Sequence, residues 1–502
     1  KDNGQTPEAA KGKKAYMVIW TTTPWTMPAN VAVALNPALE YAWVECEGEV
    51  LFMAKDLLAQ VGAACHKDLS NILGTTLGKE MEYAECVHPF PEYNNRRSLV
   101  VMADYVTTEA GTGCVHTAPG HGDVDFETGL KYKLPILCPV DSQGKLTEEA
   151  GERFKGMFVF DANIPVLKYL AELNCLLGKE NIKHQYAHCW RCKNPIIFRA
   201  TSQWFASIDG FRDDALKSID DVQWIPSWGQ QRIHNMVCDR HDWCISRQLW
   251  WGHQIPAWYC DDCGETVVAK EAPCTCPKCG SSNMTQDPDT LDTWFSSALW
   301  PFSTLGWPNE NAEDYNYFYP TNTLVTGYDI IGFWVSRMIF SGLAYTGKAP
   351  FDTVLIHGIV RDSQGRKMSK SLGNGIDPLE VIEQYGADAL RMMLIIGSTA
   401  GNDMRYSDEK VLACRNFANK LWNASRYVLM NLGEDARNEL PALDKLEIAD
   451  KWVLSKLNTL IAEVTENLEK YELGVAVQKV YDFIWDTYCD WRSEEHTSEL
   501  QS

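Results

Sequence analysis

The chain has 502 residues and a mass of 56.7 kDa, which is enough for three or four folding units of ~100–200 residues each. Hydrophobic residues make up 45% and charged residues 23%, which excludes wholesale disorder, and the net charge of −21 argues against a protein that coats nucleic acid without specificity. No apolar run reaches the ~18 residues that cross a bilayer, and the N-terminus has no apolar signal core, so we expect a cytoplasmic protein without a membrane segment.

Short β-type runs separated by Gly, Pro and Asn fill residues 1–160 and predict a compact β-rich barrel or sandwich. The first run, Ala15–Thr22, arrives without a starting domain before it, so we expect a chain cut from a longer one. Helical patterns follow near Asn163–Leu177 and Phe211–Ile219.

Apolar strands and helices alternate in the second half of the chain. The run TLVTGYD precedes a predicted helix near Ile331–Ala344, and the strand Thr353–Val360 precedes a loop and a predicted helix near Pro378–Ile396. This alternation predicts a parallel α/β sheet. From about Asp408 onward, apolar residues recur three or four positions apart, which predicts helices.

A lysine-rich loop with the sequence KMSKS follows the strand Thr353–Val360. Lys367 and Lys370 could bring positive charge to a triphosphate while negative charge moves onto departing pyrophosphate. The short side chains between them would let the backbone approach the phosphates. His357 and Gly358 on the preceding strand favour this interpretation over an exposed basic turn.

Two CxxC pairs, Cys260 with Cys263 and Cys276 with Cys279, lie twelve residues apart, and each is followed by glycine. Such pairs can wrap a tetrahedral Zn²⁺ with four thiolates, which leaves no open position for water, so the predicted role is structural. Cys274 is a spare thiol that could compete with Cys276. Unliganded buried thiols are the alternative interpretation.

Two further segments are rich in Gly, Pro and Thr: Thr21–Asn30 (TTTPWTMPAN) and Gly111–Asp125 (GTGCVHTAPGHGDVD). Their turns could aim His116 and Asp125 into a pocket, and their threonine hydroxyls could position a water. The alternative is a structural hairpin that contains a hydrogen-bonded core histidine.

Taken together, these motifs resemble those of the class I aminoacyl-tRNA synthetases, in particular the large subgroup for valine, isoleucine and leucine. The resemblance covers Lys1–Trp491. In this family a split nucleotide-binding fold carries a His-Ile-Gly-His motif in its first half and KMSKS in its second, with an editing domain inserted between the halves. The His-Ile-Gly-His motif is absent from this sequence, so we expect a fragment that begins after it.

The resemblance implies the second half of a split Rossmann-type parallel sheet, with an inserted β-rich editing domain, a zinc knuckle and the start of a C-terminal helical bundle. The expected divisions are the editing domain 1–185, the return segment 186–259, the zinc knuckle 260–283, the catalytic half-domain 284–400, stem-contact helices 401–445, a truncated anticodon-binding bundle 446–491 and an adapter-derived artefact 492–502.

The resemblance also implies roles for single residues, with ATP, Mg²⁺ and Zn²⁺ as cofactors. Lys367 and Lys370 would be catalytic, and the ATP site would add His357, Gly358, Met368, Ser369 and Ser371. The amino-acid pocket would consist of Trp294, Asp329, Ile330 and Trp334, where rigid indole walls exclude larger side chains. In the editing site Asp125 would bind the amino group of the misattached residue, together with Thr21, Thr22, Thr23, Trp25, Asn30 and His116.

A single CxxC pair, Cys189 and Cys192, has no mate in the sequence. In isoleucine-type members a similar pair shares zinc with a pair upstream of the editing domain. We therefore expect half of a metal site here and regard a redox role as the weaker alternative.

The two parts of the chain differ in the subgroup that they resemble. Residues up to about Arg240 are similar to isoleucine-specific members, and those from Leu249 are similar to valine-specific members. The change falls in Asp242–Gln248, a run that both groups share, so we hypothesise an assembly or recombination chimera. The isoleucine type has a polar DQHRGW where this chain has DIIGFW, so valine is the favoured substrate and isoleucine the alternative.

We therefore expect a tRNA synthetase fragment, monomeric and unattached to membranes, that binds an amino acid and tRNA. Phosphate contacts could come from four basic helical positions, although a solvated helix face is an equal alternative: Lys410, Arg415, Lys420 and Arg426. A stand-alone deacylase, in which only the editing domain works, is the second hypothesis. A zinc-stabilised tRNA-binding module without activity is the third.

Overall fold

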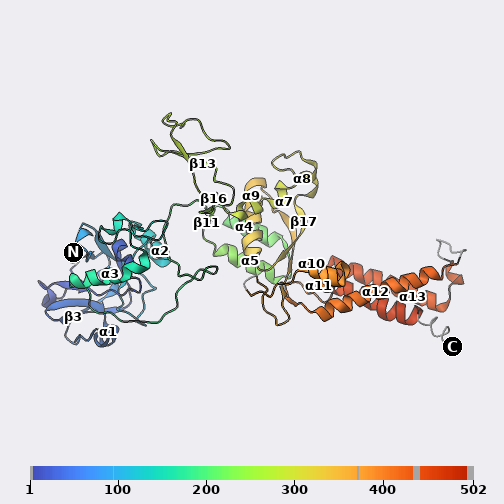
Figure 1. Ribbon diagram of the computed structural model, residues 1–502, viewed down its shortest axis with the longest axis horizontal. Coiled ribbons are helices and arrows are strands. Elements are labelled where there is room, and N and C mark those ends of the chain that lie inside the picture. Colours follow the sequence, from blue (N-terminus) through green and yellow to red (C-terminus); the bar gives the residue numbers. More distant parts are fainter. Residues whose placement is uncertain (1–3, 94, 370–371, 434–440, 494–502) are drawn as a thin grey trace. The chain divides into compact units, whose positions relative to one another are not determined.

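The computed structural model describes residues 4–93, 95–369, 372–433 and 441–493. The chain divides into two compact units, Lys1–Ser202 and Gln203–Ser502, whose elements are labelled in Figure 1. Across the described ranges, no helix combines the length and the apolar character that a bilayer crossing needs.

The first unit contains two four-stranded sheets. One sheet has the order β1-β4-β3-β5, in which β1 pairs with β4 in parallel and the other pairs are antiparallel. The other has the order β6-β7-β2-β8, in which β2 lies parallel to β7 and antiparallel to β8. The bounds are β1 Ala15–Met17, β2 Ala32–Leu35, β3 Glu40–Cys46, β4 Glu49–Ala54, β5 Ile72–Leu77, β6 Glu85–Val87, β7 Arg97–Met102 and β8 Val115–Thr117.

Both sheets contribute to one apolar core, which joins Tyr41 and Phe52 of the first sheet to Leu35 and Val100 of the second. Burial of these side chains holds the sheets together. The predicted β-rich character is confirmed, with two sheets sharing a core as in a sandwich. The barrel alternative is wrong, because no closed barrel forms among the described strands.

Three α-helices accompany these sheets: α1 (Leu58–Cys65), α2 (Asp123–Lys131) and α3 (Val159–Glu172). The helix predicted near Asn163–Leu177 is α3, shifted towards the N-terminus. It ends early because Asn174 adopts the left-handed conformation, with φ of 54°, which stops a right-handed helix.

The second unit is built around the parallel sheet β10-β18-β17 (Figure 1). The strands are β10 (Gln223–Ile225), β17 (Thr321–Gly327) and β18 (Phe351–His357), and the helices α4 (Arg212–Asp221), α5 (Trp228–Cys238) and α9 (Ser336–Thr346) contribute to the same core. This confirms the predicted parallel α/β sheet. Gly327 pairs with His357, so β17 and β18 end level with each other at the carboxyl edge of the sheet.

Glycines account for two differences from the predicted elements. The strand predicted over Thr353–Val360 is interrupted at Gly358, where a Cβ would lie 1.9 Å from the Asn402 carbonyl oxygen. The helix predicted near Pro378–Ile396 is two helices, α10 and α11, because Gly386 between them has φ of +94°. Their bounds are α10 Pro378–Tyr385 and α11 Ala387–Ile395.

The helix predicted near Ile331–Ala344 begins with one π-helical segment, η7 (Ile331–Val335), before α9. Short elements complete the unit. They are β9 Phe205–Ala206, β11 Trp243–Cys244, β12 Ser246–Arg247, β13 Ala257–Cys260, β14 Thr266–Val268, β15 Met284–Gln286, β16 Thr290–Leu291, α6 Thr293–Ser297, α7 Trp300–Ser303, α8 Glu313–Phe318, β19 Val360–Arg361 and β20 Met404–Arg405.

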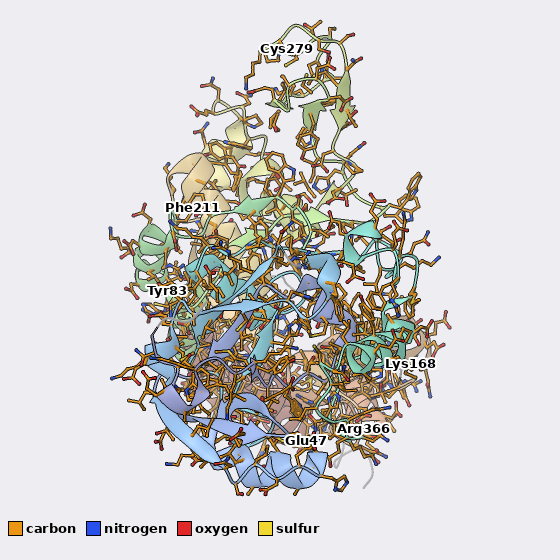
Figure 2. All side chains as sticks on the ribbon, turned by 90° about the vertical axis from the view of Figure 1, so that its left-hand side faces the viewer. Glu47, Tyr83, Lys168, Phe211, Cys279 and Arg366 are labelled. Carbon is orange, nitrogen blue, oxygen red and sulfur yellow. The ribbon has the colours of Figure 1, made fainter. Side chains whose placement is uncertain are left out.

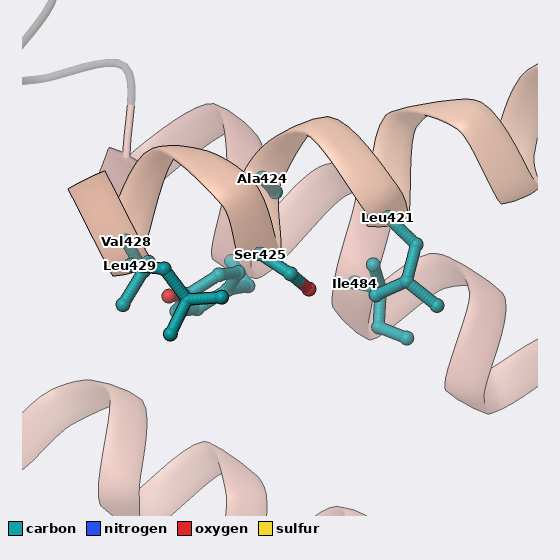
Figure 3. A pocket seen from close by; sticks show the side chains of 7 residues that line it. Leu421, Ala424, Ser425, Val428, Leu429 and Ile484 are labelled. Carbon is teal, nitrogen blue, oxygen red and sulfur yellow. The ribbon is translucent and has the colours of Figure 1, made fainter.

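Helices dominate the C-terminal part, as predicted: α12 (Asp408–Met430), α13 (Ile448–Glu469), α14 (Leu473–Asp482) and the π-helix η9 (Phe483–Ser493). Between α12 and η9 lies an apolar groove of about 330 Å³, and Figure 3 shows Leu421, Leu429 and Ile484 lining it. Among the described residues, those that line this groove carry no charge.

Candidate active sites

Lys367, in the described part of the lysine loop, lies at the carboxyl edge of the parallel sheet. Lys367 Nζ is 3.4 Å from Asp329 Oδ2, and Asp329 follows the end of β17 by two residues. The Tyr328 amide donates to the His357 carbonyl at the end of β18. Ligands of open α/β sheets bind at this edge, so the position agrees with a nucleotide site.

A buried carboxylate holds the base of this loop. Asp362 accepts hydrogen bonds from the Arg366 Nε, the Arg366 amide and the Gln364 amide, at 2.8, 2.8 and 3.1 Å. Asn374 bridges the loop by donating to Asp362 Oδ2 at 2.9 Å and to the Lys367 carbonyl at 3.3 Å. The Asn374 bond is the largest of the effects that lower the pKa of Asp362 to about 2.

Replacing Asn374 with alanine should loosen the loop. The change removes both bonds donated by Asn374 and the bond from the Ser369 amide to Asn374 Oδ1. At ~0.5–1.5 kcal/mol for each of the three bonds, we expect tryptic cleavage after Lys367 to accelerate at least about tenfold. Mass spectrometry of timed digests measures the rate.

Asn458→Ala, at an exposed position of α13, is the matched control. Unchanged cleavage in Asn374→Ala would show that the loop does not depend on the bridge.

The pKa of Asp362 in the folded protein lies below its unfolded value of ~3.9. The ionised carboxylate therefore stabilises the fold fully above pH ~3.9, and this contribution is lost as the pH falls through about 2.

Of the other predicted ATP residues, His357 ends β18 at this edge. His357 is exposed, and its Nδ1 donates to the Gly358 carbonyl at 2.7 Å. Met368 packs against the apolar cluster that contains Val381 and Met393. The predicted residues Lys370 and Ser371 lie outside the described residues.

The residues predicted for the amino-acid pocket come from α6 and from the segment that follows β17. Trp334 Nε1 donates to the Ser297 carbonyl of α6 at 3.0 Å, and the Trp334 amide donates to the Ile330 carbonyl at 2.7 Å. Trp294 of α6 stacks on Phe333, with ring centroids 6.2 Å apart. Both indoles are half-buried, and exposed Asp329 lies beside Ile330, so these four residues border one region.

In the first unit, His116 on β8 contacts the segment Thr21–Asn30, which we call the Thr-rich segment. Its Nε2 donates to Thr26 Oγ1 at 2.9 Å, because the Thr26 hydroxyl already donates to the Thr23 carbonyl. Its Nδ1 accepts from Asn30 Nδ2 at 2.7 Å. Burial lowers the pKa of His116 to about 3, so the ring is neutral and both nitrogens are occupied.

Asp125 lies in the first turn of α2. Its Oδ2 accepts from the Ala118 amide at 2.8 Å, and burial raises its pKa. In the other predicted segment, Thr21 Oγ1 accepts from the Thr23 amide at 3.1 Å, and Thr22 is exposed. The Thr-rich segment and the loop before Asp125 therefore meet through His116.

His121 belongs to the same region but was not selected from the sequence. Its ring meets Trp25 edge-on, with centroids 4.8 Å apart, and its Nδ1 lies 3.1 Å from the Phe198 carbonyl. Trp25 is 3% exposed. The only signal in the sequence is that His121 shares the GHG turn with the residues that precede Asp125.

The four predicted zinc ligands gather on the small sheet β14-β13-β15. Their sulfurs lie within 4.8 Å of one another, with 3.5 Å from Cys260 to Cys279 and 3.6 Å from Cys263 to Cys276. Zn–S bonds of ~2.3 Å in a tetrahedron require sulfurs about 3.8 Å apart, so the cluster fits zinc. The Cys279 amide stabilises the Cys276 thiolate and lowers its pKa to about 7.

The turns after each pair need glycine, because Gly264 and Gly280 have φ of +72° and +76°. Figure 2 shows Cys279 on this hairpin. Cys274 is exposed and stays outside the cluster. For Cys189 and Cys192, the described residues supply no third ligand.

The four basic positions of α12 differ in their surroundings. Lys410, Arg415 and Arg426 are exposed. Lys420 pairs with Asp490 at 3.1 Å and lies 3.9 Å from the centre of the Trp485 ring, so it is engaged within the bundle.

Two known protein families match this chain. The family tRNA synthetases class I (I, L, M and V) matches residues 13–407, and the anticodon-binding domain of tRNA ligase matches residues 450–502. A valine–tRNA ligase of Clostridium perfringens is 50% identical over 486 residues, and one of Clostridium acetobutylicum is 45% identical over 486 residues; each alignment covers 96% of this chain. An isoleucine–tRNA ligase of Caldicellulosiruptor saccharolyticus is 40% identical over 500 residues, or 94% of this chain. The chain spans about half the length of these curated relatives, 50%, 50% and 53% respectively.

Proposed function

Because the chain belongs to the class I tRNA synthetases for isoleucine, leucine, methionine and valine, we propose that it forms the pyrophosphate-binding part of a valine–tRNA ligase. The observation that carries the proposal is the position of Lys367 at the carboxyl edge of the parallel sheet, beside Asp329. There the lysine neutralises the charge that develops on pyrophosphate when valine attacks ATP. Mg²⁺ accompanies the ATP and supplies further charge neutralisation.

Valine is favoured by the region around Trp294 and Trp334. Rigid indoles at these positions would limit the size of an aliphatic side chain. The greater identity to valine–tRNA ligases than to the isoleucine relative supports the same choice. Isoleucine is the alternative, because a single methylene separates the two substrates by only ~1–3 kcal/mol.

The first unit supports a second activity, hydrolysis of mischarged tRNA. In this proposal Asp125 binds the ammonium group of the misattached amino acid, while Thr22, Thr23 and Trp25 shape the pocket. A hydrolytic second site is needed because binding alone discriminates poorly between similar aliphatic side chains. A deacylase that works without the synthetic reaction remains the second candidate for the chain by itself.

Two assays of the purified chain test these functions. The first measures exchange of labelled pyrophosphate into ATP with valine or with isoleucine. Exchange that depends on valine supports the ligase, and exchange with isoleucine alone contradicts the choice of valine. The second assay measures release of valine from valyl-tRNA(Ile), because the first unit resembles the editing domain of isoleucine-specific members.

The two assays separate the candidates. Hydrolysis without exchange favours the deacylase, and exchange without hydrolysis contradicts the editing proposal. Binding of tRNA with neither activity contradicts both enzymatic functions and leaves a binding module.

The cysteine cluster would hold a structural zinc ion, and exposed basic residues of α12 would contact tRNA phosphates. We further propose that the protein is a monomer and that it acts in the cytoplasm. The hypothesis of a chimera joined within Asp242–Gln248 is tested by long-read sequencing across codons 230–260, since one continuous natural gene would remove it.

A further inference from the structure

We propose that His121 is a further residue of the editing site, whose Nε2 accepts a hydrogen bond from the water that hydrolyses the aminoacyl ester. The inference rests on the proposed editing function and assigns within it a role that neither the motifs nor the comparisons assign.

The hydrogen bond to Phe198 fixes the tautomer of His121. A carbonyl oxygen can only accept, so Nδ1, 3.1 Å away, must carry the proton. Burial lowers the pKa of His121, which keeps the ring neutral. Nε2 therefore carries a lone pair and acts as an acceptor.

This acceptor is buried and has no hydrogen-bond partner within the described part of the chain. Trp25 Nε1, a donor on the ring that His121 meets edge-on, is likewise buried and unpartnered there. Buried polar groups are almost always satisfied by protein or by water, so two such atoms on adjacent rings indicate a polar ligand. Water can serve both, because it donates and accepts.

His116 cannot play this part without losing a bond that it already makes. Its Nε2 is bound to Thr26 and its Nδ1 to Asn30, at 2.9 and 2.7 Å. Of the two histidines in the motif, only His121 has a ring nitrogen available to a ligand. His116 instead holds the Thr-rich segment against β8.

The same turn fixes His121 and Asp125. The His121 amide donates to the Ala118 carbonyl at 2.9 Å, and the Ala118 amide donates to Asp125 Oδ2 at 2.8 Å. On the other side, the Ala200 amide donates to the Gly120 carbonyl at 2.9 Å. In an aminoacyl ester the carbonyl carbon lies two bonds from the amino nitrogen, and Ala118 holds both the ammonium-binding carboxylate and the backbone of His121.

The hydrolytic step balances without another reactant. The water oxygen forms a bond with the ester carbonyl carbon, and the bond from that carbon to the terminal ribose oxygen breaks. The ribose oxygen receives the proton that the water loses, and the amino acid leaves with a new carboxyl group. Nε2 orients the water and is unprotonated both before and after the step.

Paired substitutions test the assignment by single-turnover hydrolysis of valyl-tRNA(Ile). In His121→Asn the amide nitrogen can still donate to the Phe198 carbonyl, but nothing replaces Nε2. In His121→Gln the amide oxygen reaches the place of Nε2. We expect the Asn variant to lower the maximal rate constant about tenfold or more without changing the half-saturating concentration, and the Gln variant to stay within about threefold of the original.

His66→Asn is the matched control, because His66 is exposed in the same unit and its φ of 54° suits asparagine. Normal hydrolysis by His121→Asn, with slowed hydrolysis by Asp125→Asn, overturns the role of His121 and leaves editing intact. An equal loss in the Asn and Gln variants with a raised half-saturating concentration also overturns it, because that is the pattern of a structural residue. Absence of hydrolysis by the unmodified chain overturns the editing function and this inference together.

Discussion

Replacing Cys276 with serine should abolish zinc binding by the chain and unfold the hairpin over residues 257–286. Four sulfurs within 4.8 Å of one another form a closed tetrahedral site, and serine removes the thiolate with the lowered pKa. Structural zinc contributes ~10–16 kcal/mol of binding free energy at pH 7, so the small sheet β14-β13-β15 depends on the ion for its fold. Zinc content by atomic emission and hydrogen exchange of the hairpin amides measure the two effects.

The chain supplies its own control for this prediction. Cys274 is exposed, lies two residues away and is outside the cluster, so Cys274→Ser should keep both the zinc and the slow exchange. The parallel strands β17 and β18 should be protected equally in both variants. Loss of zinc from Cys274→Ser with retention in Cys276→Ser would assign the fourth ligand to Cys274 and contradict the geometry.

Local patterns predicted the parts of the structure that depend on local chemistry. The spacing of the cysteine pairs fixes the two knuckles, whose glycines have positive φ, and one hairpin then brings all four sulfurs together. The lysine loop follows β18, and the carboxyl ends of neighbouring parallel strands share one edge, so the order of strand and loop alone puts Lys367 near that edge.

Contacts between residues far apart in the sequence could not be predicted from local patterns. The segment Gly111–Asp125 contains two histidines, and its local pattern does not show which of them, His116 or His121, has an unpaired ring nitrogen. The difference arises when Thr26 and Asn30, about ninety positions earlier in the chain, occupy both nitrogens of His116. The break at Gly386 was missed for a related reason, because periodicity alone does not record the sign of φ.

Replacing Asp125 with asparagine should lower hydrolysis of valyl-tRNA(Ile) about a hundredfold. Asparagine keeps an oxygen that can accept from the Ala118 amide, so the turn should remain intact while the negative charge is lost. An ammonium group bound to a neutral amide loses a charge-assisted hydrogen bond, which is about twice as strong as a neutral one. Steady-state deacylation of the charged tRNA measures the loss, and Asp123→Asn, exposed in the same helical turn, is the matched control.

The pH dependence of hydrolysis independently tests the role of the negative charge on Asp125. Burial raises the pKa of Asp125, so the protonated form is reached at a higher pH than the ~3.9 of an exposed aspartate. Hydrolysis by the unmodified chain should therefore fall on acidification above that value, and the residual activity of Asp125→Asn should lack this step. If the step persists in the asparagine variant, another group binds the ammonium, because an amide does not titrate in this range.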